Sequence, residues 1–226
     1  MPDPLQRLLA GALAIASLPL VAVLVLAIRL ESSGPLIYRA ERIGRDGIPF
    51  RCFKLRTMRV NSGEGPAVTV AGDSRVSRVG AILRRFRLDE LPQLWNVARG
   101  EMRFVGPRPE APRFVDLSTP LHGRVFTSVP GITGLSQLVY VDEASMLDGL
   151  DPEAIYRTTV LPAKVQLDIA YLDRRSSSLD FWILARTIGA IAGRPMDLET
   201  IEARLGISLK HIAKAPQAPR SGGDSA

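Results

Sequence analysis

The sequence predicts a small α+β domain, mixed from helices and short strands, with an apolar helix at its N-terminus. Three observations predict this class. An uncharged apolar segment opens the chain, short extended pieces follow it, and stretches with helical spacing of apolar residues make up most of the rest. With 226 residues the chain can bury one core and hardly two independent ones. We therefore expect one folded body with a membrane element.

The first element is the apolar segment from Leu8 to Ile28, which contains no charged residue and is bracketed by Arg7 and Arg29. As a straight helix it would be ~31 Å long, about the thickness of the hydrocarbon core, so physical chemistry alone favours a spanning helix. Pro19 removes a backbone hydrogen bond near the middle, and Ser17 could bond a freed backbone group. Two arms of about ten residues each could instead enter one leaflet and return.

The residues after this segment predict where the body lies. A cleaved signal peptide fits poorly, because the basic region is thin and Arg29-Leu30-Glu31 is a poor cleavage context. Arginines follow closely at positions 29, 39, 42, 45 and 51. Such an excess of positive charge beside a membrane segment places the body in the cytosol.

The charge is formally +6, and four lysines stand against 25 arginines. Arginine binds phosphate through a bidentate fork, but basic charge alone fits nucleic acid, anionic lipid or a phosphorylated substrate equally well. One cysteine, Cys52, and two histidines, His122 and His211, provide neither a disulfide framework nor a Cys/His metal site. A metal would need carboxylate oxygens, which indicates a hard ion such as Mg²⁺.

After the apolar segment, alternation from Phe50 to Thr57 predicts a strand with Lys54 and Arg56 on one face. Val76 to Phe86 reads as a helix that leads to Asp89 and Glu90. Because Pro92 prevents a clean continuation, we expect these carboxylates beside a helix break or a helix start. The free N–H groups of a helix start would favour bound phosphate.

The C-terminal half begins with the helix opening Asp151-Pro152-Glu153, and we expect this helix to run to about Arg175 with a bend at Pro162. Leu179 to Ile191 is too short to span a membrane, so it belongs to the membrane surface or the core. We expect the membrane helix over residues 1–31, the catalytic domain over 32–194, an extension over 195–214 and a disordered tail over 215–226.

Candidate chemistry concentrates between Arg75 and Arg113, where nine arginines accompany four acids, with Asp89 and Glu90 side by side. A surface ion-pair cluster would give the same pattern. The functional interpretation is that one carboxylate attacks phosphorus while guanidinium groups neutralise the phosphate oxygens, and the other holds a metal or moves a proton. Two rigid loops follow, Phe104 to Pro109 and Pro130 to Gly134, each an ordinary turn when taken alone.

Three motifs in register make the sequence recognisable. LDELPQLWNV from Leu88, FVGPRP from Phe104 and PGITG from Pro130 closely resemble the bacterial monotopic phosphoglycosyl transferases. The segment Phe53 to Met58, Leu167-Asp168 and Asp180 also match, so the resemblance runs from about Leu5 to Ile191. Members of this family transfer a sugar-1-phosphate from a nucleotide sugar, usually a UDP-sugar, to a polyprenyl phosphate at the cytosolic leaflet of the bacterial inner membrane.

The resemblance implies that Asp89 attacks the β-phosphate, releases UMP and carries a phospho-sugar, and that Glu90 assists Mg²⁺ and proton handling. With it come Mg²⁺ as cofactor, both carboxylates as its ligands, and a re-entrant N-terminal helix broken around Ser17 and Pro19. Substrate-contacting positions carry over to Lys54, Arg56, Arg84, Arg108 and Gln137. The alternatives of a monomer and a homodimer both stay open.

The sequence also departs from the family pattern. Leu135 replaces a tryptophan, and LVYVD after Gln137 replaces Val-Asn-Gly-Arg, so one expected phosphate-binding arginine is missing. Either Arg85 or Arg87 substitutes, or the donor sugar differs, or activity is low. In the apolar segment Leu18 separates Ser17 from Pro19, where the family often has the two adjacent.

Two other hypotheses remain beside the transferase. The missing arginine is compatible with a non-catalytic membrane scaffold of the same fold in glycan assembly. A membrane-tethered nucleic-acid binder would use the arginines, but the sequence has no helix-turn-helix, ribonucleoprotein or zinc-finger pattern, so we expect no nucleic-acid partner.

Overall fold

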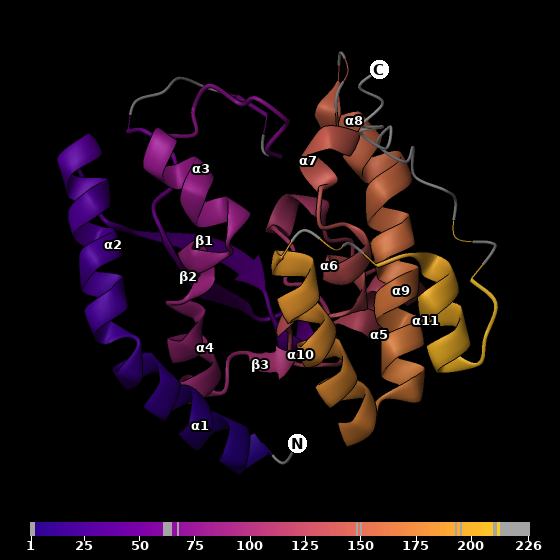
Figure 1. Ribbon diagram of the computed structural model, residues 1–226. Coiled ribbons are helices and arrows are strands. Elements are labelled where there is room, and N and C mark those ends of the chain that lie inside the picture. Colours follow the sequence, from indigo (N-terminus) through magenta and orange to yellow (C-terminus); the bar gives the residue numbers. More distant parts are fainter. Residues whose placement is uncertain are drawn as a thin grey trace, which may run out of the picture.

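The computed structural model describes residues 3–60, 65–66, 68–147, 149, 151–192, 194, 196–209 and 212. Helices surround two small sheets, and a bent pair of N-terminal helices lies along one side of the molecule (Figure 1). This confirms the predicted α+β class. The predicted disordered tail over 215–226 lies outside the described residues.

The N-terminal pair consists of α1 (Asp3–Ala16) and α2 (Leu18–Glu31), which meet at Ser17 with a bend of 55°. Pro19 has no N–H to continue the helical ladder, and the Ser17 hydroxyl donates to the Ala14 carbonyl oxygen at 2.9 Å. The predicted break is therefore confirmed. A straight spanning helix is wrong, since within the described ranges no single helix is long and apolar enough to cross a membrane.

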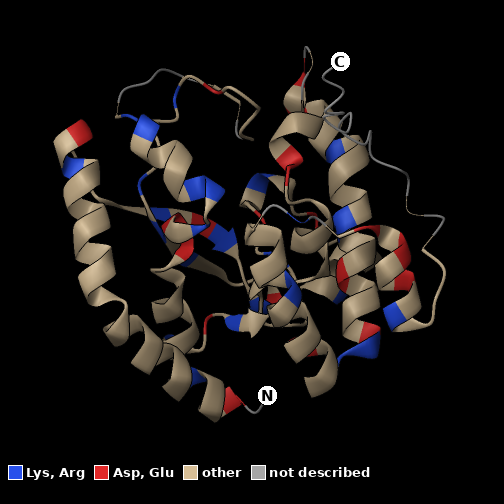
Figure 2. Cartoon of the chain, in the orientation of Figure 1, with Lys and Arg blue, Asp and Glu red and all other residues tan. Residues whose placement is uncertain are grey.

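Taken together, the two helices of the bent pair are long and apolar enough for a broken membrane span or for a re-entrant segment. α1 packs against α4, whereas only Ile28 of α2 is buried and its other apolar side chains, such as Val23 and Leu26, are exposed. Figure 2 shows α2 almost without charged residues except at its C-terminal end. An apolar surface of this extent marks an interaction site, and a lipid environment would cover it.

Two sheets of two strands follow. Strand β1 (Ile37–Ile43) pairs antiparallel with β2 (Pro49–Leu55), and β3 (Arg103–Val105) pairs parallel with β4 (Gly131–Thr133). The strand predicted from Phe50 is confirmed as β2, which places Lys54 opposite Tyr38. It ends two residues earlier than expected, so Arg56 lies beyond the strand.

Helices make up the rest of the body. They are α3 (Arg78–Arg85), α4 (Gln93–Arg99), α5 (Pro120–Val125), α6 (Leu135–Val139), α7 (Glu143–Met146), α8 (Pro152–Ile155), α9 (Leu161–Arg174), α10 (Ser177–Ile191) and α11 (Leu198–Leu205). Short 3₁₀ turns cover Arg45–Gly47, Leu88–Glu90 and Pro112–Phe114, and a π-helical turn covers Tyr156–Val160.

The predicted helix opening at Asp151 is confirmed, because its side chain accepts a hydrogen bond from the Ala154 N–H. The helical path to Arg174 is interrupted by the π-helical turn just before Pro162, where we expected a bend. A proline cannot donate to the helical ladder, and a turn with wider spacing accommodates that loss. The structure thus confirms the long helical path, and the π-helical turn accommodates the hydrogen bond that Pro162 cannot make.

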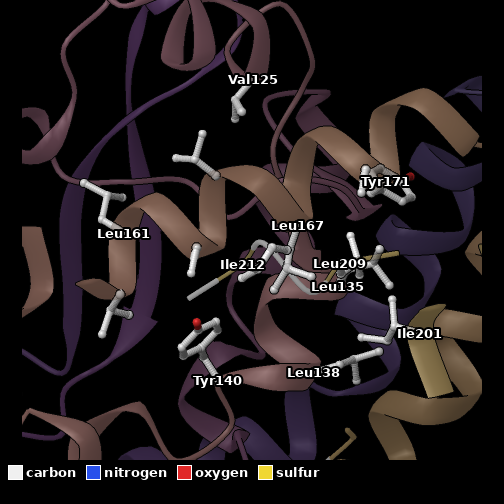
Figure 3. Packing of buried hydrophobic residues seen from close by; sticks show 14 of the residues in the cluster. Val125, Leu135, Leu138, Tyr140, Leu161, Leu167, Tyr171, Ile201, Leu209 and Ile212 are labelled. Atoms are coloured by element: carbon white, nitrogen blue, oxygen red, sulfur yellow. The ribbon is translucent and has the colours of Figure 1, made fainter. Parts of the chain in front are cut away.

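The main core lies around α9, with α6 and α11 packed about it (Figure 3), and buried residues of α10 belong to the same cluster. Leu135, Leu138 and Leu167 are its centre, and Ile201 of α11 is fully buried against them. The extension predicted over 195–214 therefore contributes to the same core where it is described. Helix α10 buries Leu179 and Ile183 but leaves Phe181 60% and Ile188 72% exposed, so it has both a core face and an apolar outer face.

Candidate active site

The two adjacent carboxylates lie on a short turn between α3 and α4. Arg87 has left-handed backbone angles (φ 52°, ψ 24°), the 3₁₀ turn Leu88–Glu90 follows, and α4 begins at Gln93 directly after Pro92. The chain cannot continue as one helix through Arg87 and Pro92, because one residue has the wrong φ and the other lacks an N–H. Asp89 and Glu90 therefore lie at a helix break, as predicted.

Glu90 is held by cations. Lys54 at the end of β2 donates a hydrogen bond to its Oε1 at 3.0 Å, and a guanidinium nitrogen of Arg87 lies 3.9 Å from its Oε2. Burial opposes ionisation, but the fields of Lys54, Arg108 and Arg87 outweigh it and lower the pKa of Glu90 to about 2. Glu90 is thus a fixed negative charge at neutral pH.

Asp89 is also buried, but its environment raises the pKa of its carboxyl instead of lowering it. Burial raises the pKa of its carboxyl, Lys54 and Arg84 lower it, and the neighbouring charge of Glu90 raises it again. The net displacement is upward. Two adjacent carboxyls are therefore driven to different proton affinities, which is the arrangement that separates the roles of paired acids in active sites.

Arg84 reaches this turn from the last turn of α3. Its Nε donates to the Thr57 hydroxyl at 2.8 Å, and its charge acts on Asp89. The approach of α3 to Thr57 requires a glycine at position 80, because a Cβ there would lie 2.1 Å from the Thr57 carbonyl oxygen. Gly80 thus allows the close packing that holds Arg84 beside the carboxylates.

Arg56, the other predicted cation on β2, has different contacts. Its guanidinium donates to the carbonyl oxygens of Ser33 at 2.7 Å and Ser32 at 2.8 Å, and to the Ser32 hydroxyl at 2.8 Å. These bonds satisfy carbonyl groups just beyond the C-terminus of α2. Arg56 therefore anchors the N-terminal pair to the body, and its contact with substrate stays a prediction.

The two glycine-bearing loops meet in the parallel pair of β3 and β4. The Gly106 N–H donates to the Thr133 carbonyl oxygen at 2.9 Å, and the Gly131 N–H donates to the Pro107 carbonyl oxygen at 2.8 Å. A Cβ on Gly131 would lie 2.1 Å from the Gly106 nitrogen. Both loops need glycine because their backbones touch, and this contact joins the second and third sequence motifs.

Asp168 of α9 joins the loop of Arg108 to the start of α6. The Arg108 N–H donates to Asp168 at 3.3 Å, and the Ser136 hydroxyl donates to Asp168 at 2.8 Å. Burial opposes the charge of Arg108, but Glu90, Glu143 and Glu110 outweigh it and raise the pKa of the guanidinium. Burial raises the pKa of Asp168 to about 7.

Gln137 is buried, and the Ser136 hydroxyl lies 3.0 Å from its Oε1. Its Nε2 has no hydrogen-bond partner in the part of the chain that the structure describes. A buried amide donor without a partner is costly, so a ligand or water acceptor at this position would be favourable. The prediction that Gln137 contacts substrate is compatible with this environment and stays a prediction.

One polar cluster was missed by the sequence interpretation. Lys164 is almost fully buried, and its Nζ lies 2.8 Å from Glu143, 3.2 Å from Glu110 and 3.0 Å from the Tyr156 hydroxyl. The available signal was a lysine on the core-facing stripe of the predicted helix, three residues after Leu161. The cluster lies near Arg108, because the charges of Glu110 and Glu143 also raise the pKa of that guanidinium.

The carboxylate pair also decides how a metal would be held. Across the described residues no group of three or more His, Cys, Asp and Glu side chains gathers to form a ligand cage. Mg²⁺ is commonly bound by one or two carboxylates, with substrate phosphates and water as the other ligands. The donor set of Asp89 and Glu90 fits this open type of site.

A cavity of about 440 Å³ lies next to the carboxylate turn. Ser17, Leu18 and Val21 at the bend of the N-terminal pair form one side, and Leu91, Pro92 and Trp95 at the start of α4 form another. Leu91 directly follows Glu90, so an apolar space adjoins the charged site. Figure 2 shows charged residues beside the middle of the N-terminal pair, which itself carries charged residues only toward its two ends.

Comparison with known proteins identifies the family to which this chain belongs. The chain belongs to the bacterial sugar transferase family, whose model matches residues 4–194, so the resemblance stated above is confirmed. It is 39% identical over 178 residues to the UDP-glucose:undecaprenyl-phosphate glucose-1-phosphate transferase of Caulobacter vibrioides, covering 76% of this chain and 62% of that protein.

Two other relatives carry different sugar names. The chain is 37% identical to the UDP-N-acetylgalactosamine-undecaprenyl-phosphate N-acetylgalactosaminephosphotransferase of Aeromonas hydrophila, over 79% of this chain and 41% of that one. It is 36% identical to the UDP-galactose-lipid carrier transferase of Erwinia amylovora, over 82% of this chain and 39% of that one. The chain thus spans about three fifths of the first relative and about two fifths of these two.

Proposed function

We propose that this protein is a phosphoglycosyl transferase that moves a sugar-1-phosphate from a UDP-sugar to a membrane polyprenyl phosphate and releases UMP. The observation that carries the proposal is the pair of adjacent carboxylates on the turn between α3 and α4, with Lys54 at 3.0 Å from Glu90 and the charges of Arg84 and Arg108 acting on the pair. The family of the chain and the names of its relatives support the reaction class.

In the first step Asp89, in its carboxylate form, attacks the β-phosphorus of the donor. A bond forms between a carboxylate oxygen and phosphorus, and the bond from phosphorus to the oxygen shared with the α-phosphate breaks, so UMP leaves. The product is an acyl phosphate that carries the sugar. Lys54, Arg84 and Arg108 neutralise the charge on the phosphate oxygens as they do on the carboxylates.

In the second step a phosphate oxygen of the polyprenyl phosphate attacks the same phosphorus. The acyl phosphate bond breaks, Asp89 returns as a carboxylate, and the product is a polyprenyl diphosphate sugar. Burial raises the pKa of Asp89, whereas the positive charges of Lys54 and Arg84 lower it. These cations therefore favour the carboxylate form, which is the nucleophile. Glu90 holds Lys54 in place, and because its pKa is lowered to about 2 it stays ionised and available to a metal ion.

Mg²⁺ is the cofactor that the donor set fits, with Asp89 and Glu90 as its protein ligands. When bound, it would neutralise charge on the pyrophosphate and on the leaving UMP. We expect a chelator to abolish the transfer and added Mg²⁺ to restore it. Activity that is unchanged after exhaustive chelation would contradict this part of the proposal.

The apolar cavity supports a lipid acceptor. An isoprenoid chain lying between the bend of the N-terminal pair and the start of α4 would bring its phosphate to the turn that follows Glu90. The exposed apolar side chains of α2 would lie in the bilayer, and the arginines after it would keep the body on the cytosolic face. The N-terminal pair would then be a bent, re-entrant segment in the inner leaflet.

The test is incubation of the purified protein with polyprenyl phosphate, Mg²⁺ and a panel of UDP-sugars, with UMP release and the mass of the lipid product as readouts. We expect UMP release by the wild-type protein and none by Asp89→Asn. The matched control is Asp46→Asn, an exposed aspartate with a positive φ that asparagine tolerates, and it should keep wild-type turnover. Undiminished turnover by Asp89→Asn would refute the role of Asp89, and UMP release itself would exclude a purely scaffolding protein.

A further inference from the structure

Arg87 stands out in the backbone of the site. Among the residues that the structure describes, it and Asp46 are the non-glycine positions with positive φ. Aspartate tolerates that region well, but a long side chain such as arginine seldom adopts it. A strained residue persists where its surroundings fix it, and here it begins the turn that carries Asp89 and Glu90.

The guanidinium of Arg87 has two loose contacts. One nitrogen lies 3.4 Å from the Gln137 carbonyl oxygen, and the other lies 3.9 Å from Oε2 of Glu90. Both distances exceed those of a tight charge-assisted hydrogen bond. The side chain thus connects Glu90 of the first motif to α6, and because it is 21% exposed it keeps N–H groups that a ligand can use.

Neighbouring arginines are engaged differently. Arg75 donates to Asp73 at 2.6 Å, and Arg56 is held at the end of α2 by bonds of 2.7 and 2.8 Å. Arg85 is exposed, and its guanidinium lies over the Phe86 ring at 5.7 Å. Of the two arginines that flank Phe86, Arg87 is the one directed toward the carboxylates.

We infer that Arg87 binds phosphate oxygens of the nucleoside diphosphate donor, in place of the arginine that the segment after Gln137 lacks. This inference rests on the proposed function and adds a donor-binding residue to it. The guanidinium lies between Glu90 and the backbone carbonyl oxygen of Gln137, at the edge of the turn that carries both carboxylates, where a pyrophosphate bound at Asp89 would meet it. A planar fork on this anion contributes binding that a point charge reproduces only in part.

The experiment measures UDP binding by calorimetry in the Asp89→Asn background, where no turnover occurs. Arg87→Asn should weaken UDP binding about tenfold or more, because it removes charge-assisted hydrogen bonds while asparagine accepts the left-handed backbone. Arg87→Lys should give an intermediate loss. The matched control, Arg85→Asn, should change the dissociation constant by about twofold or less, since that side chain is exposed and lies over Phe86.

With Asp89 intact, Arg87→Asn should raise the KM for the donor more than it lowers kcat, and the melting temperature should not fall. Wild-type UDP affinity in folded Arg87→Asn, or in Arg87→Lys if the first variant does not fold, would overturn the inference. That failure is distinct from failure of the proposed function, which would appear as absence of UMP release by the unmodified protein with every donor in the panel.

Discussion

Lys54 Nζ donates a hydrogen bond of 3.0 Å to Oε1 of Glu90, and this bond joins the end of β2 to the turn between α3 and α4. Both groups are mostly buried, so the contact is screened less than a surface ion pair. The same ammonium group also acts on Asp89, where it is the largest influence opposing burial. One lysine therefore lowers the pKa of both carboxyls.

Replacing Lys54 with methionine should therefore shift the pH dependence of activity. Without the ammonium group the charged form of Asp89 is less favourable, so the pKa of that carboxyl should rise further. The acidic limb of the kcat/KM profile should move to higher pH by about one pKa unit. Lys54→Arg, which keeps the charge, is the control. An acidic limb at the wild-type position in Lys54→Met would show that Lys54 does not lower the pKa of Asp89.

The contact between the two glycine-bearing loops predicts a large cost for Gly131→Ala. Its new Cβ would lie 2.1 Å from the Gly106 nitrogen, and neither backbone can move without breaking the β3–β4 pair. We expect a loss of about 2–4 kcal/mol in the free energy of unfolding, and a melting temperature lower by about 5–10 °C.

Gly189→Ala is the matched control for that substitution. Gly189 lies in α10 and has no atom within 4 Å of an added Cβ, so alanine there should be neutral or stabilise the helix by ~0.5–1 kcal/mol. Thermal unfolding in detergent measures both variants. Equal melting temperatures for Gly131→Ala and the wild type would show that the loops do not need close backbone contact.

The N-terminal bend predicts an effect of Pro19 on topology. With leucine at this position the N–H returns and the clash of the ring with the preceding turn disappears, which together favour a continuous helix by ~3 kcal/mol. In cells, α1 and α2 should then fuse and cross the membrane. A cysteine placed at Asp3, with Cys52 replaced by alanine, should become reactive to an impermeant maleimide added outside.

Pro4→Leu is the control, because Pro4 is in the first turn of α1, where proline is tolerated. It should leave the labelling of position 3 as in the wild type. If Pro19→Leu is labelled from the same side as the unmodified protein, the proline does not decide the topology of the pair.

The buried carboxyl of Asp168 predicts a dependence of stability on pH. Because its pKa is raised from 3.8 to about 7 in the folded protein, the folded state retains a proton that the unfolded chain has lost. Its contribution to stability is full below about pH 4 and is lost as pH rises to about 7. The difference bounds the effect at about 4 kcal/mol, since one pKa unit corresponds to about 1.4 kcal/mol.

Asp168→Asn keeps the oxygen that accepts the Arg108 N–H but cannot ionise. The melting temperature of this variant relative to the wild type should therefore rise between pH 5 and pH 8. Asp173→Asn, an exposed aspartate at the end of the same helix, should follow the wild-type curve. Parallel curves for Asp168→Asn and the wild type would exclude a buried proton at Asp168.

Local patterns determined much of the fold in advance. The break at Pro19, the strand through Lys54, the helix opening at Asp151 and the break around Asp89 each follow from residues within a few positions of one another. Proline, a capping aspartate and period-two alternation act over one turn or one strand, so a single sequence is enough to read them.

Contacts between distant segments could not be read in this way. The sequence placed Arg56 with Lys54 on one strand face, but the strand ends at Leu55 and the guanidinium turns to the end of α2. Arg85 and Arg87 were equivalent as candidates until the left-handed backbone at Arg87 turned the latter toward Glu90. The partners of Lys164 come from three separate segments of the chain.

By itself the sequence determined the chemical inventory: two adjacent carboxylates, an excess of guanidinium groups, a proline-broken apolar helix and three motifs in register. Only the tertiary structure decided which cation contacts which carboxyl, which arginine bonds to the end of α2 and where an apolar cavity adjoins the charged site. The physical reason is that charge and burial act through space. The proton affinities of Asp89 and Glu90 therefore depend on segments up to 36 residues away along the chain.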